Sequence, residues 1–278
     1  MRTIRRIVLR INSPSDMQAK AVLEEAGIKF KRGDITVELD EQDPTWPRAE
    51  RICLEFDLIH DHRYSVFTDD ERASAQYLEI SPRMSDENPR PWRNLERLKE
   101  VCDTREMCPT CFKGARQIAP LRLKKAPRWG EHWLFNLIWY FDSPRWEMPP
   151  HLNFTCVRED VYMQVLEPAG VPCQPLLLDG SETVVPGVVQ IQPSQSAQIA
   201  TAGLPLTPCE SCGGITYNQP WYGFRPAVLG ATAPLVESAE WFGVHKRLGE
   251  HLLMVSQALY RQLRELDKAE LFIPCAEI

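Results

Sequence analysis

The chain has 278 residues, of which 44% are apolar and 25% are charged, and this balance excludes a disordered polypeptide. Its most apolar stretch, 133–141, contains an asparagine and has about half the length of a membrane-spanning helix, so no transmembrane segment is expected. A formal net charge of −6 gives no general attraction to the phosphates of nucleic acids and would favour a basic partner.

The first thirteen residues, MRTIRRIVLRINS, interleave arginine with aliphatic residues. They lack the unbroken apolar segment and the small-residue cleavage site of a signal peptide, so we expect a cytoplasmic protein. In that compartment the nine cysteines would stay reduced. Closely spaced cysteine pairs there more often bind metal or do redox chemistry than form structural disulfides.

The N-terminal third is predicted to contain a strand, a helix and a meander of short strands. Residues 4–11 read as the strand. In 12–27, Ser13 is placed to cap a helix, Pro14 fits its first turn, Asp16 completes a capping box and Gly27 marks its end. Alternating apolar residues then predict half-buried antiparallel strands at 28–30, 34–40, 51–60, 64–68 and 75–80.

The segment SPRMSDENPRP (81–91) is rich in proline, serine and charge, which is typical of a linker. The sequence therefore predicts an N-terminal domain over 1–85 and a second domain over 86–278. A helix is expected at 92–102, and strands at 121–129 and 133–141. Because the chain also has 23 prolines, we predict an α+β fold of short, mostly antiparallel strands with a few amphipathic helices.

An internal similarity relates 155–171 to 253–269 at an offset of 98 residues, and each segment predicts a strand, a helix, a turn and a second strand. The identical pairs are Val157/Val255, Tyr162/Tyr260, Gln164/Gln262 and Glu167/Glu265. Two interpretations are open. The chain either contains a duplicated module or aligns two amphipathic helices by chance.

Two Cys-x-x-Cys motifs, CPTC and CESC, are the clearest chemical signal, and they recur at an offset of 101 residues. Such a turn directs two thiolates to the same side of a loop, so two turns can complete a tetrahedral site. We expect one structural zinc ion, held by Cys108, Cys111, Cys209 and Cys212. It would join segments separated by 97 residues. Free thiols and a redox pair are the alternatives, although neither motif has the helix-start context of a redox site.

A site closed by four thiolates leaves no coordination position for water or substrate, so a zinc ion there would be structural rather than catalytic. The sequence also contains no known catalytic motif, so we expect a binding protein rather than an enzyme. Cys102 is a conceivable substitute ligand. The remaining apolar-flanked cysteines, Cys53, Cys156 and Cys275, are expected to pack in the core.

Three further segments are weaker candidates. His60 and His62 lie close to several aspartates but are expected at the end of a strand, where solvation alone explains them. The basic segment 121–129 ends in Trp129 and could contact nucleic acid, or could be an edge strand with solvated charges. The aromatic segment 218–226 could contact a protein partner or cover the metal site.

The two cysteine motifs, the strand-to-helix segment at 154–171 and the C-terminal segment 252–272 together resemble the double-CXXCG motif family, a bacterial group known as a paralogous set in myxobacteria. The resemblance covers roughly 105–278. It departs at the first motif, where Phe112 and Lys113 replace the glycine.

The resemblance implies no established activity. Small, acidic, paralogous bacterial proteins of this kind are similar in character to immunity proteins. We therefore expect a protein that neutralises a cognate toxin by occluding it, with a nucleic-acid-binding zinc protein as the alternative.

Overall fold

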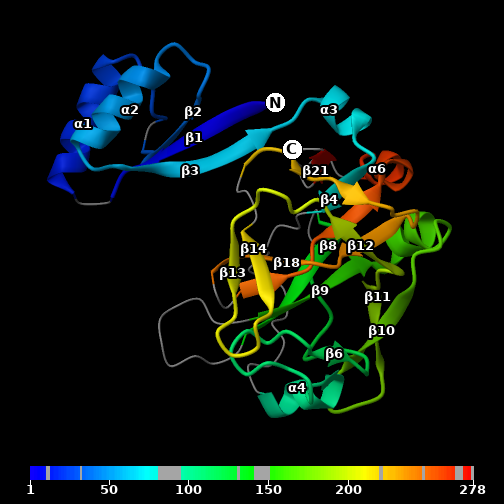
Figure 1. Cartoon of the computed structure of the whole chain (residues 1–278). Helices are drawn as coiled ribbons and strands as arrows, with labels where there is room; N and C mark the ends of the chain where they lie inside the picture. The colour runs from blue at the N-terminus through cyan, green and yellow to red at the C-terminus, as the bar shows by residue number, and fades with distance from the viewer. Residues whose placement is uncertain are drawn as a thin grey trace. The chain divides into compact units, whose positions relative to one another are not determined.

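The computed structural model describes residues 1–10, 13–31, 33–80, 95–129, 132–140, 151–218, 222–245, 248–266 and 272–276. It mixes many short strands with few helices, which confirms the predicted α+β class. The chain forms two compact units (Figure 1). The smaller unit is Met1–Arg72 with Pro220–Phe224, and the larger unit is Ala73–Gln219 with Arg225–Ile278. The predicted linker at 81–91 and domain boundary at residue 85 lie outside the described residues.

The smaller unit packs two helices on a three-stranded antiparallel sheet of order β2-β1-β3. Its elements are β1 (Arg2–Val8), α1 (Pro14–Glu25), β2 (Thr36–Asp40), α2 (Trp46–Glu55) and β3 (Ile59–Val66). Its core joins Ile7 of the sheet with Leu23 of α1 and Ile52 of α2. The predicted strand and helix at 4–27 are confirmed.

The strand predicted at 51–60 is wrong over most of its length, because 51–55 belong to helix α2 and only Ile59 and His60 belong to a strand, β3. The alternation of Ile52, Leu54, Phe56 and Leu58 suggested a strand, but Leu54 is 67% exposed. The buried positions are instead Ala49, Ile52 and Cys53, whose spacing of three and four residues is that of one helix face. The segment 28–30 also forms no strand.

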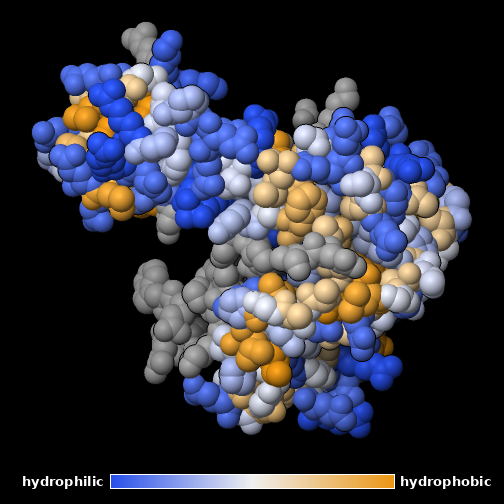
Figure 2. Space-filling model, turned by 45° about the horizontal axis from the view of Figure 1, so that its top comes forward, coloured by the Kyte–Doolittle hydropathy of each residue, from blue (hydrophilic) through white to orange (hydrophobic). Residues whose placement is uncertain are grey.

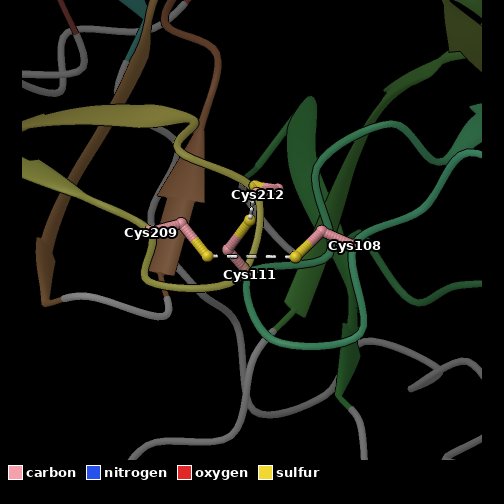
Figure 3. A group of neighbouring side chains, drawn as sticks. All are labelled: Cys108, Cys111, Cys209 and Cys212. Carbon is pink, nitrogen blue, oxygen red and sulfur yellow. Dashed lines mark hydrogen bonds between the residues drawn. The ribbon is translucent and has the colours of Figure 1, made fainter.

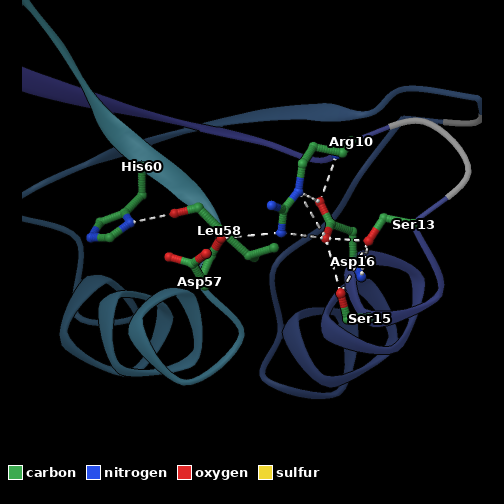
Figure 4. Close-up of polar contacts among 7 residues, drawn as sticks. All are labelled: Arg10, Ser13, Ser15, Asp16, Asp57, Leu58 and His60. Carbon is green, nitrogen blue, oxygen red and sulfur yellow. Dashed lines mark hydrogen bonds and ion pairs between the residues drawn. The ribbon is translucent and has the colours of Figure 1, made fainter.

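The predicted cap of α1 is present, because the Ser13 hydroxyl accepts a hydrogen bond from the backbone N–H of Asp16 (Figure 4). The Asp16 carboxylate turns instead toward the preceding strand end. It accepts from the backbone N–H of Arg10 at 2.6 Å and pairs with the guanidinium of Arg10 at 2.9 Å. This guanidinium holds the pKa of the buried Asp16 carboxyl well below its usual range.

The larger unit contains two main sheets. The five-stranded sheet has the order β7-β10-β11-β9-β8 and comprises β7 (Arg122–Leu123), β8 (Leu134–Tyr140), β9 (His151–Arg158), β10 (Cys173–Leu178) and β11 (Val184–Ile191). The seven-stranded sheet has the order β15-β21-β4-β20-β17-β12-β16 and comprises β15 (Arg225–Pro226), β21 (Phe272–Ala276), β4 (Tyr77–Ile80), β20 (Leu253–Ser256), β17 (Leu235–Ser238), β12 (Gln195–Ile199) and β16 (Val228–Leu229).

Two small sheets carry the segments around the cysteine motifs. One has two strands, β5 (Cys102–Asp103) and β6 (Arg116–Gln117), and the other has four strands, β13 (Leu206–Pro208), β14 (Ile215–Asn218), β18 (Trp241–His245) and β19 (Leu248–Glu250). The remaining helices are α3 (Asp69–Ser74), α4 (Leu95–Val101), α5 (Glu159–Val161), its π-helical continuation η1 (Tyr162–Leu166) and α6 (Gln257–Leu263). Helix α4 confirms part of the helix predicted at 92–102.

Both predicted strand–helix–strand segments are present. The first is β9, α5 with η1, and β10, and the second is β20, α6 and β21. The helices of the two segments contribute to one hydrophobic cluster, where Tyr162 and Val165 join Leu259 and Tyr260.

Within the described residues, none of the helices is both long enough and apolar enough to span a membrane. The face shown in Figure 2 is largely hydrophilic, with hydrophobic residues in separate groups.

One carboxyl group of the larger unit is held in an unfavourable environment. Glu250 of β19 accepts a hydrogen bond from the side-chain amide of Asn153 of β9. Burial raises the pKa of its carboxyl to about 7, and the nearby charge of Glu79 adds to the effect. The folded protein therefore binds this proton more tightly than the unfolded chain does.

We expect Glu250→Gln to remove a pH dependence of stability. A raised pKa means that the contribution of Glu250 is fully present below its ordinary pKa of 4.5 and is lost as the pH rises through about 7. At pH 8 the ionised group costs about 3 kcal/mol relative to pH 4, and the glutamine variant avoids this cost. Urea unfolding between pH 5 and pH 8 measures the difference. The exposed Glu265→Gln is the control, and equal pH profiles for both variants would contradict the assignment.

Candidate metal site

The structure brings the two cysteine motifs together, as the sequence predicted (Figure 3). The four Sγ atoms of Cys108, Cys111, Cys209 and Cys212 all lie within 4.8 Å of one another. Across the motifs, Cys108 Sγ is 3.8 Å from Cys209 Sγ, and Cys111 Sγ is 3.6 Å from Cys212 Sγ. A tetrahedral zinc–thiolate site with bonds of about 2.3 Å has edges of about 3.8 Å. The sulfurs are therefore placed to hold one metal ion.

The two loops that present the sulfurs have the same backbone hydrogen bonds. In the first, the N–H of Cys108 donates to the carbonyl of Lys113 at 2.8 Å, and the N–H of Phe112 donates to the carbonyl of Cys108 at 2.9 Å. The second loop repeats both bonds. The N–H of Cys209 donates to the carbonyl of Gly214 at 2.9 Å, and the N–H of Gly213 donates to the carbonyl of Cys209 at 2.8 Å. Each loop is thus a closed turn around its pair of thiols.

The residue after each second cysteine has a left-handed backbone, with a φ of 60° at Phe112 and 72° at Gly213. This conformation costs a non-glycine residue about 1–2 kcal/mol. Phe112 adopts it while its side chain packs against the hydrophobic cluster around Leu98 and Leu121. The first motif therefore forms the same turn as the second without the expected glycine.

The loops also adjust the protonation of the thiols. Hydrogen bonds from the backbone N–H groups of Cys111 and Thr110 lower the pKa of Cys108 to about 6. Burial raises the pKa of Cys111 to about 12. Since metals bind the thiolate form, metal binding here would release protons and would weaken at low pH.

A lysine that the sequence analysis noted only as a departure from the family motif lies beside the sulfurs. Lys113 is buried, donates a hydrogen bond from its ammonium group to the carbonyl of Ile215, and lies 5.5 Å from the ring centre of Trp241. A positive charge here offsets part of the negative charge that four thiolates would bring to a divalent ion. Its position two residues after Cys111 is the sequence signal that could have identified it.

The other cysteines named in the sequence analysis are buried away from the metal site. Cys102 is buried in the cluster of Leu98 and Leu121, and it does not belong to the four-sulfur group. Burial raises its pKa to about 12. The residues predicted to pack in the core, Cys53, Cys156 and Cys275, are buried, which confirms that prediction.

Among the described side chains, His60 and His62 belong to no group that could hold a metal ion. His60 and His62 lie within strand β3 rather than at its end, and the Nδ1 of His60 lies 2.8 Å from the carbonyl of Leu58. Among the described residues, the four cysteines are the one group of potential ligands close enough to share an ion.

The basic segment 121–129 forms only the short strand β7. Arg122 pairs with the carboxylate of Glu182 at 2.6 Å. Trp129 packs against Phe135 with ring centres 4.8 Å apart and donates to the carbonyl of Gly187. The indole that could have stacked on a base is thus engaged within the larger unit.

In the aromatic segment 218–226, residues 219–221 lie outside the described part of the chain. Tyr222 stacks on the guanidinium of Arg63 at 5.1 Å, and Phe224 lies 5.2 Å from Phe67. Both contacts are made within the smaller unit, although Tyr222 stays 43% exposed. The aromatic residue next to the metal site is instead Trp241, whose ring lies below the ammonium group of Lys113.

Comparisons of the chain with protein-family models, with curated proteins and with solved structures give no match.

Proposed function

We propose that the protein binds one zinc ion through Cys108, Cys111, Cys209 and Cys212, and that the ion is structural. The observation that carries the proposal is the set of sulfur–sulfur distances, 3.8 Å and 3.6 Å, across two loops of identical hydrogen bonding. Four thiolates suit zinc and also iron. Zinc is favoured because it is the usual ion of closed four-cysteine sites that stabilise a fold. Such a site needs no redox chemistry, and zinc has none.

Elemental analysis of the purified protein tests the identity of the ion. We expect one zinc per chain, and a cobalt-substituted protein with the absorption spectrum of a tetrahedral thiolate site. Iron in place of zinc, or a preparation without metal that melts at the same temperature after zinc is added, would contradict the proposal.

For the biological role we propose a non-enzymatic immunity protein that binds and occludes a cognate toxin. Support comes from the closed site, which leaves no open coordination position, and from the resemblance of the cysteine motifs to the double-CXXCG family. Charge steering by an acidic protein would assist capture of a basic toxin.

Co-expression with the toxin encoded by the neighbouring gene tests this role. We expect the cells to survive and the two proteins to elute as one complex. Death of the cells together with separate elution would count against it. Salt-dependent retention on nucleic acid would instead support the alternative, which is weakened by the packing of Trp129.

A further inference from the structure

The two main sheets of the larger unit share one arrangement of strands. In the order β7-β10-β11-β9-β8, the strand pairs are parallel, antiparallel, antiparallel and antiparallel. In the order β15-β21-β4-β20-β17 the pairs have the same orientations in the same sequence. In each set a helix joins the second and fourth strands, which are parallel to each other and separated by one antiparallel strand.

The agreement extends to single residues. Across the first sheet, Leu134 pairs with Val157, Val157 with Val189, and Val189 with Pro175. Across the second sheet, Leu235 pairs with Val255, Val255 with Leu78, and Leu78 with Pro274. Val157 and Val255 are the identical pair found in the sequence, and the fourth position is proline in both rows. Because a shift of one residue would reverse every side chain, a chance similarity would not preserve this register.

The residues next to each row member along its strand point to the opposite face of the sheet, as strand geometry requires. They are buried in two separate clusters: Phe135, Cys156, Val188 and Leu176 in one, and Val236, Met254, Tyr77 and Cys275 in the other. The rows themselves contribute Leu134 and Val157, together with Leu235 and Val255, to one shared cluster. The two sheets thus have equivalent inner and outer faces.

Equivalent parts of the two halves also touch each other, as happens next to a two-fold axis. Cys108 meets Cys209 and Cys111 meets Cys212 (Figure 3). The hydroxyls of Thr110 and Ser211 lie 2.5 Å apart, and the two members of each pair are separated by 101 residues. The helices η1 and α6 are in contact as well.

One strand breaks the order of the chain. In the first half, β11 follows β10 through the loop 179–183 and fills the middle of the sheet. In the second half the same place is taken by β4, which precedes both halves in the sequence.

We propose that 102–191 and 206–276 are two copies of one module, that β4 is the displaced fifth strand of the second copy, and that the cysteine site is a metal bridge between the copies on their local two-fold axis. Each copy supplies one loop and two sulfurs. The arrangement is that of a metal-bridged dimer within one chain, and it does not depend on which metal is bound.

Moving β4 to the end of the chain tests the proposal. In the transposed variant, 77–80 are replaced by a glycine–serine segment, and a copy of the loop 179–183 followed by a copy of 75–80 is added after Ala276. Both copies then have the same strand order. We expect one metal per chain, as in the unaltered protein, and recovery of the cooperative unfolding that is lost when 77–80 are replaced without the addition.

The matched control carries Leu78→Asp in the added strand, which places a charge at a fully buried position, and should show no recovery. A transposed variant as unstable as the replacement alone would count against the proposal. An experimentally determined structure of the unaltered protein gives a second measurement. Superposing the copies should place Val157 on Val255 and Cys108 on Cys209, and a different register would overturn the proposal whatever the variants do.

Discussion

Cys209→Ala is expected to lower the free energy of unfolding of the larger unit by about 4–5 kcal/mol, because the metal closes a loop of about 100 residues that the unfolded chain would otherwise leave open. For a unit of this size the melting temperature should fall by roughly 10–20 °C. The variant should also lose its tightly bound metal, since three thiolates bind more weakly than four. Thermal unfolding followed by circular dichroism, with elemental analysis of the same sample, measures both effects.

Cys173→Ala is the control for this experiment, because Cys173 lies outside the four-sulfur group. It should keep its metal and most of its stability. A chelator should lower the melting temperature of the unaltered protein toward that of Cys209→Ala and should leave the variant unchanged. If chelation removes the metal without changing the melting temperature, the ion does not stabilise the fold.

The convergence of the cysteines could be predicted because Cys-x-x-Cys is a local motif with a specific chemistry. Both cysteines of the first motif recur in the second motif 101 residues later, which also indicated that the two turns are alike. The sequence did not indicate that Phe112 would adopt the left-handed conformation normally given by glycine. That conformation is maintained by packing of the side chain in a cluster built from distant residues.

Helix α2 shows the limit of reading periodicity over short segments. The apolar residues of 51–58 fit both an alternating and a helical pattern, and only the contacts of the smaller unit select the helical one. The strand at 75–80 was expected from its own sequence, but its partners were not. It pairs with β20 and β21, nearly 200 residues later in the chain.

Charged residues inside the larger unit were missed for the same reason. Glu79 and Arg225 are separated by 146 residues and form an ion pair in which each side chain is only 9% exposed. Neither residue stands out locally. Such a pair becomes visible only when β15, β21 and β4 are placed side by side.

The second large effect is expected from Arg225→Met, which leaves the carboxylate of Glu79 buried without its guanidinium partner. Removing one member of a buried ion pair costs about 3–5 kcal/mol, because the other charge stays buried and loses the opposite charge beside it. Glu250 increases the cost here, because its carboxylate repels that of Glu79. Besides burial, the charge of Glu79 raises the pKa of Glu250. Urea unfolding of the purified variant at pH 8 measures the loss.

The double variant Glu79→Gln with Arg225→Met separates the penalty of an unpaired charge from the loss of packing. It should recover most of the stability, because a neutral amide then replaces the carboxylate that lost its guanidinium. The exposed pair Arg158 and Asp160 supplies the control, since Arg158→Met should change stability by no more than about 1 kcal/mol. If Arg225→Met costs no more than Arg158→Met, the pair is solvated in solution. The side of the seven-stranded sheet formed by β15, β21 and β4 would then be more open than the structure shows.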